Sequence, residues 1–189
     1  MAPLEPGDVL IIGSGPAGLT AALTLVRQGH TAILFDSGRY RNVDVKHMHM
    51  IPTWDHRNPT EFREKVRIEI QNHYASVRIE DVEVTDARKS NDSLFEVTDG
   101  NSRVWKGKKV ILATGPANIY PDIPGYADFW ASECSYHCLY CERYEERGTA
   151  RSGVLAVQTA SMIPMAIHLA ENTANLSSSL HLRSEELST

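Results

Sequence analysis

Residues 8–36 read DVLIIGSGPAGLTAALTLVRQGHTAILFD, and this stretch decides the fold. Its first apolar residues are consecutive, without the alternation of a half-exposed strand, which predicts a buried strand of a parallel sheet. Helical spacing of Leu19, Leu23 and Val26 follows, and a second apolar run ends at Asp36. Strand, glycine turn, helix and strand in this order are typical of an α/β Rossmann-type fold that binds a dinucleotide.

The glycine turn GSGPAG explains how such a ligand is held. Gly13 permits the tight turn, Gly15 lets the backbone approach a pyrophosphate, and Gly18 lets the helix pack closely on the strand. The unpaired N–H groups and the partial positive charge of the helix N-terminus suit phosphates. Asp36 stands where a carboxylate can accept from ribose hydroxyls. The alternative is a glycine turn in some other α/β protein.

Two features favour a flavin over a nicotinamide nucleotide. Pro16 and Ala17 lie inside the glycine turn, and the sequence SGRYRN follows Asp36 directly. Arg39 and Arg41 in that segment are placed to reach a phosphate or an adenine, although a solvated basic loop is the alternative.

A loop rich in ring-bearing side chains follows, HMHMIPTWDHRNP at residues 47–59. It lacks acid or thiol ligands at the usual zinc spacing, so we expect no metal in it. A loop that lies along a flat cofactor is the better prediction.

The segments after this loop predict one helix and more strands. Residues 59–74 have one apolar stripe and begin with Pro-Thr, which indicates a helix. Alternating segments between about 77 and 106 indicate a small antiparallel meander. The strand KKVILATGP then returns to the core and ends in a turn at 113–115, on the strand edge where open α/β sheets bind ligands.

Composition excludes several classes of partner. The net charge is −5 and the basic residues are scattered, so no nucleic acid is expected. No segment approaches the roughly 20 apolar residues of a membrane span, and no secretory signal is seen, so no membrane partner is expected. Three cysteines, an odd and low count, argue against a secreted disulfide framework and indicate a reducing, cytoplasmic location.

A cysteine pair stands in residues 137–148, HCLYCERYEERG. A CxxC holds both sulfurs in one turn, as thiol–disulfide exchange requires, and lowers the pKa of the first thiol. His137 is placed to favour the thiolate, and Glu142 to shuttle a proton. Two rival interpretations are a zinc site from the three cysteines and His137, and an iron–sulfur site that includes Cys134. Neither has the further motifs or chain length that such sites need.

Several motifs, in their order along the chain, resemble those of the thioredoxin reductase-like flavoproteins: GSGPAG, FDSGRYRN, HMHM with WDHRNP, ILATGP, DIPGY and HCLYCERYEERG. The resemblance extends over about residues 7–183. It is greatest to the dithiol oxidases of fungal epidithiodiketopiperazine (gliotoxin-type) biosynthesis.

This resemblance implies a cofactor, a catalytic pair and a partner. Cys138 and Cys141 would form a redox-active disulfide, with Cys141 facing the flavin and Cys138 exchanging with a small-molecule dithiol or disulfide substrate. A homodimer is implied as well. The cofactor would be FAD, contacted by Gly13, Ser14, Gly15, Pro16, Ala17, Gly18, Asp36, Ser37, Tyr40, Arg41, His49, Ala113, Thr114 and Gly115.

The sequence departs from the family pattern in places. Arg143 stands where the family has glycine, Glu142 where aspartate or histidine is usual, and His49-Met50 where a His-Asn pair is usual. The turn at 158–161 has no glycine fingerprint, so NADPH is not expected on this chain.

We therefore expect a two-dinucleotide-binding-domain flavoprotein fold, C-terminally truncated. Residues 1–117 would form the FAD-binding domain, and residues 118–189 an incomplete NADPH-type domain that carries the CxxC. The expected function is FAD-dependent dithiol–disulfide oxidoreduction in secondary-metabolite biosynthesis. The alternatives are an NADPH-dependent thioredoxin reductase-like enzyme and a truncated, inactive FAD-binding remnant.

Overall fold

The computed structural model describes residues 7–90, 94–120, 122–126, 164 and 167. The chain divides into two compact units, Met1–Ala127 and Asp128–Thr189, and all the elements below belong to the first. Most of residues 118–189, predicted as an incomplete NADPH-type domain, lie outside the described residues. The predicted division at 117/118 therefore stays a prediction.

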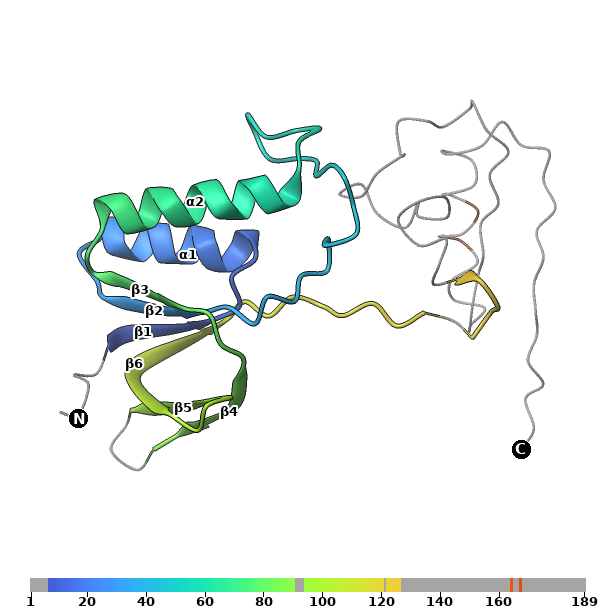
Figure 1. The fold of residues 1–189 in the computed structure, drawn as a ribbon. Helices are drawn as coiled ribbons and strands as arrows, with labels where there is room; N and C mark the ends of the chain where they lie inside the picture. Colours follow the sequence, from blue (N-terminus) through green and yellow to red (C-terminus); the bar gives the residue numbers. More distant parts are fainter. Residues whose placement is uncertain (1–6, 91–93, 121, 127–163, 165–166, 168–189) are drawn as a thin grey trace, which may run out of the picture. The chain divides into compact units, whose positions relative to one another are not determined.

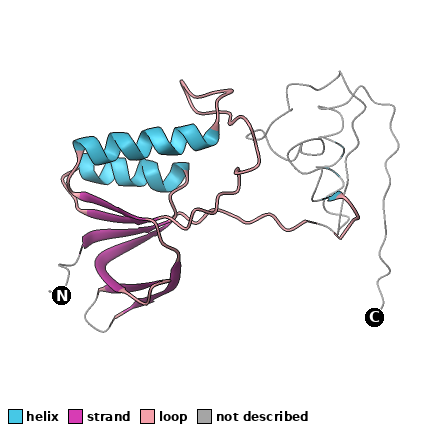
Figure 2. Cartoon of the chain, viewed as in Figure 1, coloured by secondary structure: helices cyan, strands magenta, loops and turns pink. Residues whose placement is uncertain are grey.

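One mixed sheet carries the two described helices on one of its faces (Figures 1 and 2). Its strand order is β3-β2-β1-β6-β5-β4; the pairs among β3, β2, β1 and β6 are parallel, and β6-β5 and β5-β4 are antiparallel. This arrangement confirms the predicted Rossmann-type α/β fold. The elements in chain order are β1 (Gly7–Ile12), α1 (Pro16–Arg27), β2 (Ala32–Phe35), α2 (Pro59–His73), β3 (Val77–Glu80), β4 (Val84–Lys89), β5 (Phe95–Asp99) and β6 (Val104–Leu112).

Both helices begin with proline at a first-turn position, where its missing N–H costs nothing. The side chain of Asn58 caps α2 by accepting from the backbone N–H groups of Thr60 at 2.8 Å and Glu61 at 3.2 Å. Helix α1 has no side-chain cap, so its N-terminal N–H groups keep the capacity to bind an anion. Among the described residues, neither helix has the length and apolar character that crossing a membrane would require.

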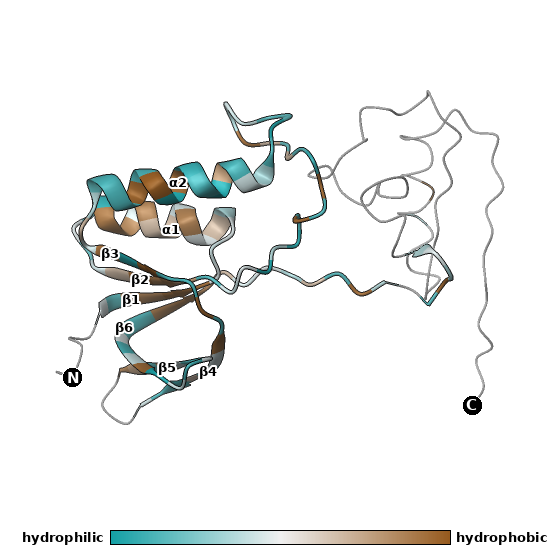
Figure 3. Ribbon diagram, viewed as in Figure 1, coloured by the Kyte–Doolittle hydropathy of each residue, from teal (hydrophilic) through white to brown (hydrophobic). Residues whose placement is uncertain are grey.

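Two apolar clusters, one on each face of the sheet, explain why β1 reads as a continuous apolar run. Val9 and Ile11 pack with the helices, in the cluster that includes Leu19 and Ile70. Leu10 lies in the opposite cluster with Phe35, Val97 and Trp105. Figure 3 shows apolar colour along the central strands and mainly polar colour along α2. A strand buried on both faces has no polar side to alternate with.

The structure corrects the predicted meander. Val77–Glu80 pairs in parallel with β2 in the core sheet, so the antiparallel part begins only at β4. Strand β6 is continuous: its first half pairs with β5 and its second half with β1. The error came from the alternation of residues 77–80, which an edge strand covered on one face shows as clearly as a meander strand does.

Trp105 is the largest side chain of the second cluster, and it generates a stability prediction. Its ring packs edge-on against Phe35 at 5.5 Å between centroids, and its Nε1 donates to Asp99 at 2.8 Å. Trp105→Ala should cost about 3–5 kcal/mol of unfolding free energy, because it empties a packed site. The matched control is the exposed neighbour in Val104→Ala, expected within about 0.5 kcal/mol. Urea unfolding measures both, and equal midpoints would contradict the packing of Trp105 in this cluster.

Candidate nucleotide-binding site

The predicted cofactor-binding segments meet at the carboxyl ends of β6, β1 and β2. Ile12 is in register with Phe35 on one side and Leu112 on the other. Beyond the strands, the N–H of Gly13 donates to the carbonyl of Phe35 at 3.0 Å, and the N–H of Ala113 donates to the carbonyl of Ile12 at 2.8 Å. Three segments that are distant in sequence therefore form one continuous edge.

The three glycines of the turn have different surroundings. Gly13 has φ +110°, and a Cβ built there would lie 2.3 Å from the carbonyl oxygen of Ala113. A Cβ on Gly18 would lie 1.8 Å from the carbonyl oxygen of Gly13. A Cβ on Gly15 meets nothing within 4 Å, and its φ of −73° suits any residue. Packing within the chain thus requires the outer two glycines, and the middle one borders space that a ligand can use.

Ser14 gives a second sign of a ligand at this turn. The side chain is buried, with 2% exposure, and its Oγ has no hydrogen-bond partner within the described part of the chain. Leaving a buried hydroxyl unpaired costs about 1–3 kcal/mol. A hydroxyl beside an open helix N-terminus and an open glycine fits the pyrophosphate of a dinucleotide such as FAD.

Asp36 lies at the end of β2, as predicted, and its carboxylate is already engaged. Oδ1 accepts from the N–H of Gly38 at 2.9 Å, while Oδ2 accepts from the Tyr40 hydroxyl and from the Arg67 guanidinium. Burial and the hydrogen bond to Asp36 raise the pKa of Tyr40 to about 12. Asp36 therefore orders the segment that follows β2, and its ribose contact stays a prediction.

Two arginines of α2, Arg63 and Arg67, contact Tyr40 and Asp36. Neither was predicted from the sequence as part of the site. Arg67 also pairs with Asp81 after β3. Arg63 is buried, lies 3.8 Å over the Tyr40 ring and donates to Asn42 at 2.9 Å. The available signal was that Arg63 stands one turn after the helix start and seven residues before Ile70, on the face expected to be buried.

The remaining predicted contacts at this edge come from two loops. The Nε of Arg41 donates to Asn118 at 3.1 Å, which joins the segment after β2 to the segment after β6. Ser37 is exposed and accepts from the N–H of Arg39. Gly115 has φ +65°, a backbone conformation that favours glycine. Ala113 packs against the glycine turn, and Thr114 links it to Gly115.

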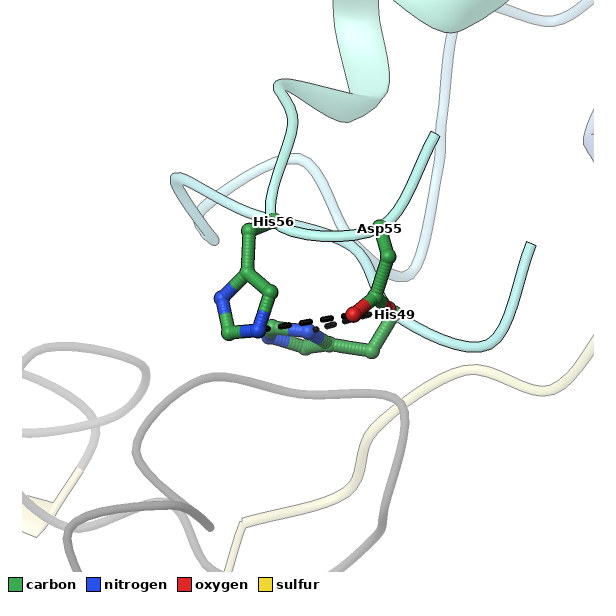
Figure 4. A group of neighbouring side chains, drawn as sticks. All are labelled: His49, Asp55 and His56. Atoms are coloured by element: carbon green, nitrogen blue, oxygen red, sulfur yellow. Dashed lines mark ion pairs between the residues drawn. The ribbon is translucent and has the colours of Figure 1, made fainter. Parts of the chain in front are cut away.

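His49 lies in a separate, ordered loop, residues 47–58. Its side chain is buried, with 9% exposure, and its Nε2 has no partner among the described residues. Asp55 and His56 lie beside it (Figure 4). The predicted catalytic residues, His137, Cys138, Cys141 and Glu142, lie outside the described residues, and their roles stay predictions.

Fold and site together define a Rossmann-type dinucleotide-binding domain. The comparisons with known proteins extend this result. The model of the pyridine nucleotide-disulphide oxidoreductase family matches residues 7–154, and the chain belongs to that family.

Several of its curated relatives are fungal proteins named thioredoxin reductases. The chain is 47% identical to thioredoxin reductase tcpT of Claviceps purpurea, over 94% of this chain and 55% of the relative. It is 46% identical to thioredoxin reductase aclD of Aspergillus oryzae, over 89% and 54%. These values confirm the predicted thioredoxin reductase-like family. The chain spans about half the length of these relatives.

Two solved structures are similar to this chain in fold. HlmI superposes with a TM-score of 0.78 at 30% identity, covering 89% of this chain and 52% of that one. The oxidoreductase from Agrobacterium tumefaciens superposes with a TM-score of 0.75 at 35% identity, covering 88% and 53%.

Because Gly15 and Gly18 have different surroundings, the same glycine-to-alanine substitution should have different effects at the two positions. Gly15→Ala should leave the fold intact and weaken FAD binding by about tenfold or more, about 1.4 kcal/mol, because the methyl group enters the ligand's space. Gly18→Ala should instead destabilise the chain by about 1–3 kcal/mol through overpacking. Flavin fluorescence titration and urea unfolding separate the two. Unchanged FAD affinity in Gly15→Ala would mean that this turn is not the cofactor site.

Ser14→Ala should stabilise the ligand-free chain by about 1 kcal/mol, because it removes a buried hydroxyl that lacks a partner. The same change should weaken FAD binding. Thermal unfolding with and without FAD tests both effects, with the exposed Ser37→Ala as control, expected within about 0.5 kcal/mol without FAD. A destabilised ligand-free Ser14→Ala chain would show that the hydroxyl serves the protein and not a ligand.

Proposed function

We propose that this chain is the FAD-binding part of a FAD-dependent dithiol–disulfide oxidoreductase that acts on a small-molecule dithiol. The observation that carries the proposal is the buried, unpartnered Ser14 hydroxyl beside a middle glycine, Gly15, that faces open space. A dinucleotide pyrophosphate fits these two features, and the family to which the chain belongs is named for redox chemistry with disulfides.

Different residues at this edge would contact different parts of the cofactor. The turn at 13–18 and the uncapped N-terminus of α1 would hold the pyrophosphate. Asp36, with Tyr40 and Arg67, holds the segment that would border the ribose, and Arg41 is tied to the loop after β6. When bound, FAD supplies a two-electron acceptor for a dithiol.

The sulfur chemistry is proposed for the pair Cys138 and Cys141. One thiolate of the substrate attacks Cys138, a mixed disulfide forms, and Cys141 leaves as a thiolate. The second substrate thiolate then attacks its own disulfide-bonded sulfur and releases Cys138. The substrate loses two electrons and two protons as its S–S bond forms, and the cysteine pair gains them. His137 and Glu142 stand next to the pair in sequence, where they would stabilise a thiolate and move a proton.

A small metabolite is proposed as substrate because of the family resemblance of the motifs around WDHRNP and the cysteine pair. Secondary-metabolite biosynthesis, a homodimeric state and a cytoplasmic location belong to the same proposal. The relatives tcpT and aclD are both fungal proteins, which agrees with it.

One finding favours a second function. The relatives tcpT and aclD are named thioredoxin reductases, and a reductase of that kind would pass electrons from NADPH to a disulfide. In the oxidase, electrons would pass from the substrate to the cysteine pair; in the reductase, they would pass from the cysteine pair to the substrate. Consumption of NADPH by the chain with a disulfide substrate would favour the reductase, and oxygen consumption with a dithiol would favour the oxidase.

The first measurement is the absorbance spectrum of the purified 189-residue chain, before and after dithiothreitol. A flavin band that bleaches is expected, because a reduced cysteine pair would pass its electrons to the flavin. Cys138→Ser should keep the flavin and abolish disulfide exchange, with Cys134→Ser as the matched control. A chain that stays colourless with added FAD would contradict the proposal and favour the inactive remnant. Loss of flavin in Cys138→Ser would contradict the role of that cysteine.

A further inference from the structure

The loop at residues 47–58 is closed by the backbone. Met48 and Arg57 form an antiparallel bridge, in which the N–H of Met48 donates to the carbonyl of Arg57 at 2.8 Å. Residues that flank a bridged antiparallel pair face each other. His49 and His56 therefore come together, with their ring centroids 4.6 Å apart.

Contacts with α2 hold this loop in place. The Nε1 of Trp54 donates to the carbonyl of Asn58, the α2 cap, at 3.1 Å. The Trp54 ring also packs against Phe62 and under the Arg57 guanidinium. The backbone that carries the two imidazoles is thus held by contacts other than the one between the rings.

Asp55 supplies a carboxylate beside both rings. Its Oδ1 lies 3.5 Å from Nδ1 of His49, and its Oδ2 lies 3.4 Å from Nε2 of His56 (Figure 4). Oδ1 also accepts from the N–H of Met50 at 2.9 Å. This hydrogen bond orients the carboxylate.

The separations suit a shared metal ion better than direct hydrogen bonds. Hydrogen bonds of the N–H···O type are about 2.7–3.2 Å long, shorter than either distance. Ligand atoms at about 2.0–2.1 Å from a tetrahedral Zn²⁺ lie about 3.3–3.4 Å apart. One ligand atom from each of His49, Asp55 and His56 lies within 4.8 Å of the others. The distances of 3.5 and 3.4 Å end on different oxygens of the carboxylate, so binding of one ion requires a small movement of these side chains.

We propose that His49, Asp55 and His56 form a binding site for a divalent transition metal of the Zn²⁺ class, with a fourth position open to solvent. Two imidazoles and one carboxylate are a donor set that zinc uses in proteins. From the sequence, no metal is expected in this loop, because no acid stands at the usual zinc spacing. The bridge supplies the acid through folding, because it turns the chain back between His49 and Asp55.

The site leaves the other nitrogen of His49 available. An imidazole that binds a metal through Nδ1 carries its proton on Nε2, and Nε2 is the buried atom without a partner among the described residues. If the proposed flavin function holds, this N–H would donate to the cofactor, which agrees with the contact predicted for His49. The metal site itself needs no flavin.

Cobalt titration of the purified 189-residue chain tests the site, because Co²⁺ replaces Zn²⁺ and reports its ligands by colour. The three cysteines compete for the metal, so all are changed to serine in the chain titrated (Cys134→Ser, Cys138→Ser and Cys141→Ser). We expect saturable binding of one ion per chain, with visible d–d absorption and no thiolate charge-transfer band. Competition by Zn²⁺ should then remove the colour.

Matched variants locate the ligands. Asp55→Asn keeps an oxygen that can accept from Met50 but loses the charge, and His56→Gln removes an exposed imidazole. Each substitution should lower the affinity for the metal by at least about tenfold, a loss that even the change of a residue outside the ligand set can produce. His47→Gln, an exposed histidine of the same loop, should leave binding unchanged, and circular dichroism checks the fold of each variant.

Two results would overturn the site. One is the absence of saturable binding in the cysteine-free chain, which would assign any metal binding of the full chain to its thiols. The other is equal affinity in Asp55→Asn, His56→Gln and His47→Gln, which would indicate adventitious binding. Neither result concerns the flavin, since FAD content is measured separately by absorbance.

Discussion

The packing of α1 against the turn that precedes it is the constraint on which the binding edge depends. There is no room for a single methyl group between Gly18 and the carbonyl of Gly13, or between Gly13 and Ala113. This contact draws the carboxyl ends of β1 and β6 and the N-terminus of α1 together. Backbone packing therefore places the uncapped helix end and Ser14 next to Gly15.

Charge at this edge is arranged around one buried carboxylate. Asp36 is 4% exposed, and a buried charge requires partners. Arg67 supplies the opposite charge, and the Tyr40 hydroxyl and the N–H of Gly38 also donate to the carboxylate. Because α2 provides Arg67, the helix does more than cover the sheet: it fixes the segment after β2, on which the predicted ribose and adenine contacts lie.

Much of this could be predicted from the sequence, for reasons that are local. The glycine turn and the apolar runs around it are governed by backbone sterics and by burial on both faces, and both leave a mark in consecutive residues. The partners of Asp36 could not be found in this way, since Arg67 is 31 positions away. The meander was placed wrongly at Val77–Glu80, because an edge strand of a parallel sheet alternates as an antiparallel strand does.

In the loop at 47–58, the spacing of residues along the chain does not reveal which side chains lie close together. Its ligand spacing matches no common zinc pattern, but one bridge between Met48 and Arg57 is enough to set His49 opposite His56, with Asp55 beside both. The loop is anchored on α2 through Trp54 and Asn58, whereas Ser14 and Gly15 are positioned by β1 and α1. The two sites therefore have separate structural supports, so loss of the metal ligands should leave the nucleotide turn intact, and loss of the turn should leave the loop intact.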